Sequence, residues 1–96
     1  MNIIKLEYEF SADKNHLLIK ERGISLEDVI VALNNDKLLD TINHHNLEKY
    51  PKQKIYVVDI NGYAYLVPFV KKDKHTIFLK TIFPCRKMTR KHLKGE

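Results

Sequence analysis

Two apolar runs joined by one dipeptide constrain the fold of this chain more than any other feature. The runs are Lys54–Ile60 and Tyr63–Val70, and the dipeptide is Asn61-Gly62. Asn-Gly readily adopts the positive φ angles of a type I′ turn, whose twist matches that of the strands it joins. The segment therefore predicts a β-hairpin with a two-residue turn.

Both faces of this predicted hairpin are largely apolar. A two-residue turn places Val58 opposite Tyr65 on one face and Val57 opposite Leu66 on the other. Strands with two apolar faces are typical of the centre of a sheet that is covered on both sides. Pro68 has no amide hydrogen, so its strand is expected to be unpaired or bulged on one side at that position.

The N-terminal part of the chain predicts one strand and two helices. Residues 3–10 alternate loosely between apolar and charged side chains, which is typical of a half-exposed strand. Ser11 is a good N-cap and Gly23 a good stop for a first helix. Ser25 and Asp28 approximate a capping box at the start of a second helix. The expected buried residues are Leu17 and Leu18 in the first helix, and Leu26, Val29, Ile30 and Leu33 in the second.

The remaining segments complete the expected fold. A short strand is predicted at 38–42, a loop at 44–53, a third strand at 76–83 that Pro84 ends, and a basic helix at 86–94. Helices followed by strands favour an α+β fold with a mostly antiparallel sheet. We therefore expect one domain over residues 1–96, with two N-terminal helices and a short basic C-terminal helix.

The charge of the chain favours an acidic partner. The 96 residues carry a formal net charge of +5, which attracts nucleic acid, an anionic membrane or an acidic protein. Cys85 is the single cysteine, so the fold does not rely on an oxidising compartment. No apolar run is long enough to span a bilayer, and no signal peptide is recognisable. These features predict a cytoplasmic, soluble protein that does not enter a membrane.

Metal and nucleophile motifs are not found in the sequence. His44 and His45 are adjacent and the other histidines are scattered, without the spacing that places two ligands on one metal. Cys85 stands beside two cations, but we expect it to be a small packing residue. No glycine-rich phosphate loop is present. We therefore expect neither a metal nor a cofactor.

The strongest chemical signal is the basic C-terminal end. Six cations lie within fifteen residues: Lys80, Arg86, Lys87, Arg90, Lys91 and Lys94. On a helix, Arg86 and Arg90 lie one turn apart, and like charges at this spacing destabilise a helix by roughly 0.2–0.5 kcal/mol. A phosphate backbone or an acidic partner would relieve this repulsion. The alternative is a solvated basic tail without a partner.

Three stretches follow one another in an ordered pattern. Phe10–Asn15 and Arg22–Val29 give an aromatic residue, a helix cap, a lysine, a glycine and an acidic pair, and Ile77–Ile82 is followed by the basic pair Arg86-Lys87. This pattern resembles the BrnT-like toxins of bacterial type II toxin–antitoxin systems. The resemblance implies a compact RelE-like fold and a metal-independent ribonuclease that arrests translation. It also implies a small DNA-binding antitoxin that masks the active face in a toxin–antitoxin hetero-oligomer.

A ribonuclease of this kind needs few groups of its own, because RNA carries its nucleophile, the 2′-hydroxyl. The enzyme must orient that hydroxyl, move protons and neutralise charge on the phosphate. The candidates for phosphate stabilisation are Lys80, Arg86 and Arg90. The candidates for acid or base are His44, Tyr50 and His92. Lys87, Lys91 and Lys94 are expected to bind the RNA, which includes ribosome-associated mRNA.

Two other functions remain open from the sequence. The first is a non-catalytic basic module that binds RNA or the ribosome. The second is a protein-interaction domain whose basic helix docks an acidic peptide. A ribonuclease cleaves RNA in the presence of EDTA, whereas a binding module retards it in a gel and leaves it intact.

Overall fold

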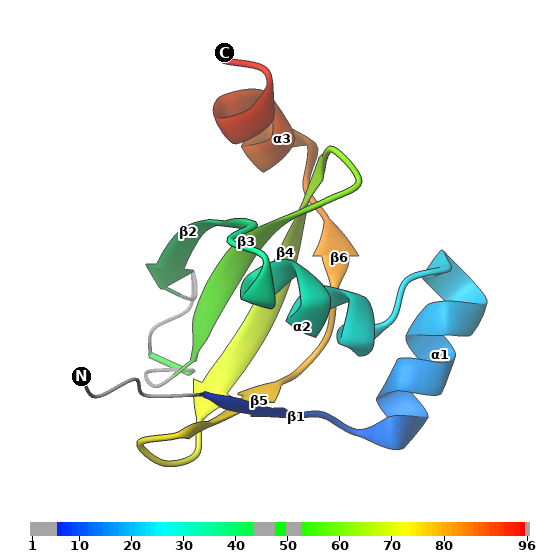
Figure 1. Cartoon of the computed structure of the whole chain (residues 1–96), viewed down its shortest axis with the longest axis vertical. Helices are drawn as coiled ribbons and strands as arrows, with labels where there is room; N and C mark the ends of the chain where they lie inside the picture. Colours follow the sequence, from blue (N-terminus) through cyan, green and yellow to red (C-terminus); the bar gives the residue numbers. More distant parts are fainter. Residues whose placement is uncertain (1–5, 44–47, 50–52, 96) are drawn as a thin grey trace.

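In the computed structural model, a six-stranded sheet carries α2 across one face, with α1 beside α2 and α3 at the end near the β3–β4 turn (Figure 1). The structure describes residues 6–43, 48–49 and 53–95. The elements are β1 (Glu7–Glu9), α1 (Ala12–Arg22), α2 (Leu26–Asn34), β2 (Leu38–Asn43), β3 (Lys54–Ile60), β4 (Tyr63–Lys71), β5 (Thr76–Leu79), β6 (Phe83–Pro84) and α3 (Arg86–Leu93). The predicted α+β architecture, with two N-terminal helices and a short basic C-terminal helix, is confirmed.

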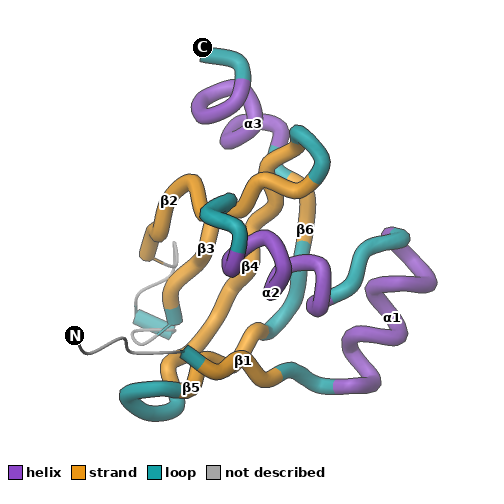
Figure 2. Tube along the Cα trace, viewed as in Figure 1, coloured by secondary structure: helices purple, strands orange, loops and turns teal. Residues whose placement is uncertain are grey.

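The strands run in the order β1-β5-β4-β3-β2, and β6 pairs with β4. β1 pairs with β5 in parallel, whereas every other pairing of the described strands is antiparallel. β1 and β5 lie together at the end of the molecule away from α3 (Figure 2). The sheet is therefore mixed, and mostly antiparallel as predicted.

The predicted hairpin is confirmed in turn and in register. Asn61 and Gly62 have φ angles of 54° and 82°, the positive values that the two-residue turn requires. Val58 lies opposite Tyr65, and β3 and β4 occupy the centre of the sheet. The Asp59 carboxylate accepts a hydrogen bond from the Gly62 amide at 2.9 Å, which fixes the turn from the strand side.

The continuous strand predicted at 76–83 is wrong. β5 ends at Leu79, and a separate short strand, β6, begins at Phe83 and includes Pro84. The Pro68 carbonyl accepts a hydrogen bond from the Lys80 amide at 2.8 Å, so the edge of Pro68 that lacks an N–H faces this chain. If β5 continued past Leu79 alongside β4, it would lack one hydrogen bond at Pro68. The unpaired side expected at Pro68 therefore lies where β5 ends, before β6 begins.

The helix ends follow the predicted caps. The Ser11 hydroxyl accepts a hydrogen bond from the Lys14 amide, and Gly23 ends α1 at a φ of 67°. At α2, Ser25 and Asp28 form both hydrogen bonds of a capping box. These local bonds fix where both helices begin and where α1 ends.

The buried side of α1 differs from the prediction. Leu18 is buried, but Leu17 is 44% exposed. The second inward residue is Asn15, whose side chain accepts from the Leu26 amide at 2.7 Å and donates to the Glu27 carboxylate at 2.8 Å. α1 therefore uses a buried amide to hold the first turn of α2, where the pattern alone suggested a second leucine.

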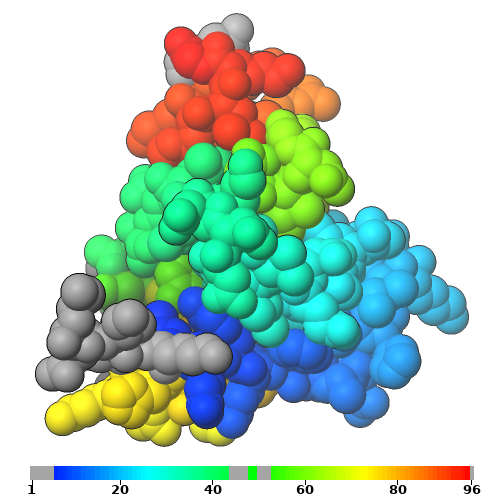
Figure 3. All heavy atoms as spheres, in the orientation of Figure 1, coloured from blue at the N-terminus to red at the C-terminus, as the bar shows by residue number. Residues whose placement is uncertain are grey.

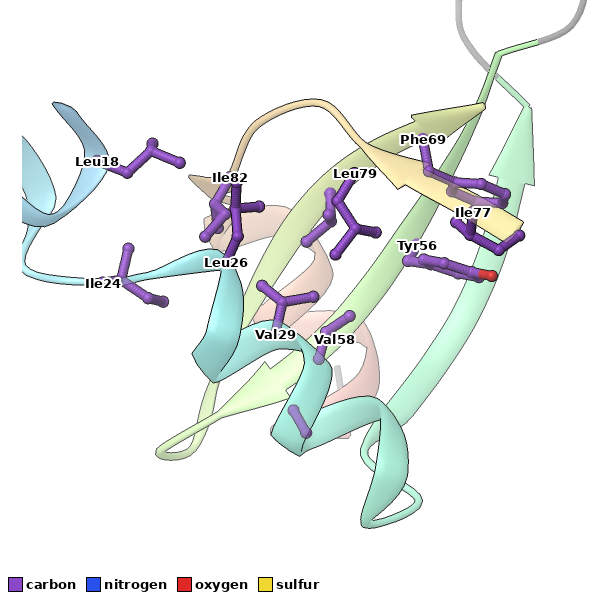
Figure 4. Packing of buried hydrophobic residues seen from close by; sticks show 12 residues of the cluster. Leu18, Ile24, Leu26, Val29, Tyr56, Val58, Phe69, Ile77, Leu79 and Ile82 are labelled. Atoms are coloured by element: carbon purple, nitrogen blue, oxygen red, sulfur yellow. The ribbon is translucent and has the colours of Figure 1, made fainter. Parts of the chain in front are cut away.

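The main core lies between α2 and the face of the sheet that we name the helix face. Figure 4 shows Val29 of α2 beside Val58 of β3, and Leu26 of α2 beside Ile82. The predicted apolar face of α2 is confirmed, with Leu26 and Val29 fully buried. The helix-face core also contains Tyr56, Val67, Phe69, Ile77 and Leu79.

The opposite side of the sheet, which we name the far face, carries the alternate residues of the central strands. They include Ile55, Val57 and Ala64, all of which are buried. The prediction that both faces of the hairpin are buried is confirmed for these positions. α3 packs on the far face at the end near the β3–β4 turn, as its contacts with β4 and Asp40 show.

The outer strands are shorter or more irregular than the pattern suggested. β1 covers Glu7–Glu9 of the predicted 3–10, and residues 1–5 lie outside the described residues. β2 extends the predicted 38–42 by one residue and has an irregularity between Leu38 and Asp40.

Candidate nucleic-acid interface

α3 is anchored to the central strand β4 through Thr89, which is 2% exposed. The Ala64 amide donates to the Thr89 hydroxyl oxygen at 2.9 Å, and that hydroxyl donates to the Cys85 carbonyl at 2.9 Å. The Cys85 amide in turn donates to the Ala64 carbonyl at 3.0 Å. This closed set of hydrogen bonds holds the start of α3 in one position on the sheet.

The anchoring of Thr89 decides which side of α3 faces solvent. Thr89 is buried and Met88, His92 and Leu93 are half-buried, whereas the other four side chains of the helix are exposed. Four exposed cations line one shallow hollow: Arg86, Lys87, Arg90 and Lys91. Figure 3 shows the atoms of α3, in red and orange, at one end of the molecule next to the β3–β4 turn. The structure therefore brings four of the predicted residues together.

The charges on α3 are not balanced locally. No carboxylate of the described residues lies within 4.0 Å of any of the four cations, since the described ion pairs are Lys72–Glu9 and His92–Asp40. The first turn of α3 contains no acidic residue, and the N-cap Cys85 makes no side-chain capping bond. Cations in the first turn oppose the partial positive charge of a helix N-terminus, so an anion bound there would relieve two unfavourable interactions.

Lys80 lies apart from these four cations. Its amide donates to the Pro68 carbonyl, whereas α3 is held at Ala64, four residues earlier in β4. At about 3.3 Å per residue, the two points are about 13 Å apart. The Lys80 ammonium is exposed and lies 5.5 Å from the centre of the Phe78 ring. Lys80 is therefore attached to the sheet at a different point from α3 and can bind a second point on a long ligand.

His92 is the predicted acid or base whose surroundings the structure describes. Its side chain is 19% exposed, and its Nε2 atom is buried without a hydrogen-bond partner. The nearest carboxylate oxygen is Oδ2 of Asp40, at 3.9 Å. Asp40 was not predicted as a site residue, because nothing in the sequence indicates that β2 brings it under α3.

Three other residues were predicted to belong to the site: Lys94, His44 and Tyr50. Lys94 is exposed and forms the C-terminal cap of α3, next to the basic cluster. His44 and Tyr50 lie outside the described residues, so their proposed roles stay predictions. Cys85 is half-buried at the start of α3, where its backbone is bonded to β4.

A second hollow lies on the helix face, beyond the part that α2 covers. It is lined by Leu6, Thr41, Lys54, Tyr56, Phe69, Lys71 and Ile77. The Tyr56 and Phe69 rings stack with centroids 3.8 Å apart. Burial, followed by the nearby Tyr8, raises the pKa of Tyr56 to about 12, so this phenol is neutral at physiological pH. Among the described residues, two lysines line the hollow and no histidine or carboxylate does.

Comparison with known proteins adds no assignment: no family model matches the chain, and no curated protein is a significant match. Within the part of the chain that the structure describes, no three histidine, cysteine, aspartate or glutamate side chains are grouped to hold a metal ion. None of the described helices is long and apolar enough to cross a membrane.

Proposed function

We propose that this protein is a metal-independent ribonuclease toxin of a type II toxin–antitoxin module, which cleaves RNA and thereby inhibits translation. The observation that carries the proposal is the group of four exposed cations on α3, with no described carboxylate paired to them. Arginine and lysine at this density suit a phosphodiester backbone. A half-buried imidazole, His92, lies on the same helix.

The proposed chemistry needs only the RNA and these side chains. The 2′-oxygen attacks the adjacent phosphorus, the bond from phosphorus to the 5′-oxygen breaks, and a cyclic phosphate and a 5′-hydroxyl result. A base takes the 2′ proton, and the leaving oxygen receives a proton from an acid or from water. Arg86 and Arg90 stabilise the charge that grows on the phosphate oxygens, while Lys87 and Lys91 hold the flanking backbone.

The fold agrees with this proposal. Two N-terminal helices, central antiparallel strands and a basic C-terminal helix agree with the RelE-like fold that the BrnT-like resemblance implies. The cytoplasm is the compartment in which such an activity has its substrate. Together with the activity, we propose a RelE-like fold, membership of the BrnT-like family and a cytoplasmic location.

A cognate antitoxin is the second partner that the proposal requires. The α3 cluster would be masked by an acidic segment of a small DNA-binding protein, because opposite charges would pair where RNA otherwise binds. Co-expression of the two proteins is expected to give a tight complex and to restore growth. Expression of this chain alone is expected to slow growth of the host.

The decisive experiment measures RNA cleavage with EDTA present. We expect cleavage by the natural protein and loss of at least about a hundredfold in the Arg86→Ala, Arg90→Ala double variant, since removal of one charge-stabilising donor costs that much in other enzymes. The matched control is Lys20→Ala with Lys74→Ala, which removes one exposed cation from α1 and one from the turn between β4 and β5. Both variants should melt near the natural protein, because exposed changes usually cost less than about 0.5 kcal/mol.

The other outcomes separate the alternatives. Retardation of intact RNA in a gel, lost in the α3 variant and kept in the control, would replace the ribonuclease with an RNA-binding module. Binding of an acidic peptide without any affinity for RNA would identify a protein-interaction domain. Equal cleavage by all variants would place the active site away from α3.

A further inference from the structure

Strand β2 contains an irregularity immediately before Asp40. Leu38 pairs with Val58, and Asp40 pairs with Val57. The pairing therefore advances by two residues on β2 but by only one residue on β3. A bulge of this kind changes the direction in which the following side chain points. Asp40 pairs with a far-face residue and is half-buried, so its carboxylate lies under α3.

The Asp40 carboxylate is held by its own backbone. Oδ1 accepts a hydrogen bond from the Thr41 amide at 2.8 Å, which leaves Oδ2 free of that bond. Oδ2 is the atom that faces His92, at 3.9 Å from Nε2. Because 42 residues separate β2 from α3 along the chain, this meeting depends on the anchoring of α3 at Thr89.

The surroundings of the buried Nε2 atom of His92 favour one protonation form of the neutral ring. Nε2 is shielded from solvent and has no hydrogen-bond partner, and a buried polar atom without a partner costs free energy. A proton on Nε2 that points toward the carboxylate reduces this cost, whereas a bare lone pair facing a carboxylate does not. Hydrogen bonds of this kind are often long in the free state and shorten when substrate binds.

We infer that Asp40 is a positioning residue that holds His92 with its proton on Nε2 and thereby leaves Nδ1 to exchange a proton with RNA. The inference rests on the proposed ribonuclease function. Nδ1 accepts the 2′ proton as the oxygen–phosphorus bond forms, and the positive charge that results on the ring is stabilised by Asp40. Water supplies the proton for the 5′-oxygen, and the hydroxide formed takes the proton back from the ring.

The first test observes the ring directly and needs no activity. In protein labelled with nitrogen-15 on histidine, at a pH where imidazoles are neutral, we expect His92 to carry its proton on Nε2 and to show slow exchange of that proton. In Asp40→Asn, slow exchange should be lost and the two tautomers should become mixed. His16 and His75 are exposed and serve as controls within the same spectrum.

The second test measures cleavage kinetics. Asp40→Asn should lower kcat by at least about tenfold with little change in KM, and His92→Gln by at least about a hundredfold, since acid–base catalysis contributes roughly 10²–10⁴. Asp36→Asn is the matched control, because it removes the same charge just before β2 at an exposed position with a φ of 59° that asparagine accepts. The variant with both Asp40→Asn and His92→Gln should be no slower than His92→Gln alone, since Asp40 acts through His92.

The outcomes distinguish this inference from the proposed function. A proton on Nδ1 in the natural protein, or an Asp40→Asn spectrum with unchanged exchange and tautomer, would overturn the pairing whatever the activity. Natural-rate cleavage by folded Asp40→Asn, or a double variant whose two losses multiply, would overturn the positioning role while the ribonuclease stands. Absence of any cleavage by the natural protein would refute the proposed function, and the role in catalysis with it.

Discussion

Replacement of Thr89 by valine tests how α3 is attached to the sheet. The change keeps the shape of the side chain and removes the hydroxyl that bridges Ala64 and Cys85. The Ala64 amide, in a fully buried residue, then has no acceptor. The Cys85 carbonyl keeps its second bond, from the Thr89 amide at 3.1 Å. One buried donor without a partner is therefore the main loss.

The magnitude follows from that count. A buried donor left without a partner costs roughly 1–3 kcal/mol, so we expect a loss of about 2 kcal/mol in the free energy of unfolding. For a chain of this size each kcal/mol lowers Tm by roughly 4–8 °C, so the expected fall is roughly 8–16 °C. Thr89→Ser is the control, because it keeps the hydroxyl and loses one buried methyl group, worth about 0.8 kcal/mol.

The assay combines denaturant unfolding with amide hydrogen exchange. Unfolding gives the free energies of the three proteins, and exchange reports whether the Ala64 amide loses protection in Thr89→Val alone. If Thr89→Val were as stable as the natural protein, or more stable than Thr89→Ser, the hydroxyl bridge would not be what holds α3, and the explanation for its fixed orientation would fail.

Two further predictions concern the sheet. Gly62→Ala should lower the free energy of unfolding by about 1–2 kcal/mol, because a φ of 82° is strained for alanine. A steric clash does not contribute, since the added Cβ meets no atom within 4 Å, and an unchanged melt would contradict the prediction. Tyr56 has a pKa of about 12 in the folded chain against about 10 when unfolded, so the unfolded chain releases this proton first and stability should fall as pH rises from about 10 to about 12. Tyr56→Phe should flatten that part of the stability–pH profile, and a profile identical to the natural one would contradict the burial argument.

The parts of the fold that short-range rules determine could be predicted from the sequence. Asn61-Gly62 fixes a turn whose length sets the register of both strands, so every pairing across β3 and β4 follows from it. Ser25 and Asp28 lie within one helical turn, and their capping bonds depend on nothing distant. The four cations of the candidate site were predictable for the same reason, since their spacing on one helix brings them together.

The parts that distant contacts determine could not. β5 stops at Leu79 because Pro68, on the neighbouring strand, cannot donate a bond to its continuation. Leu17 is exposed because Asn15 takes the inward position to bond the start of α2. The contact between Asp40 and His92 requires a bulge in β2 and the docking of α3 on the sheet. The local sequence pattern predicts neither.

The parallel pairing of β1 with β5 also limits when the molecule can be completed during synthesis. Glu7 pairs with Thr76, so the first strand finds its partner only after about 70 further residues have been made. The segment that supplies this partner is followed within ten residues by the start of α3. β5 and the helix that carries the cations therefore leave the ribosome almost together, and a nascent chain that lacks β5 also lacks α3.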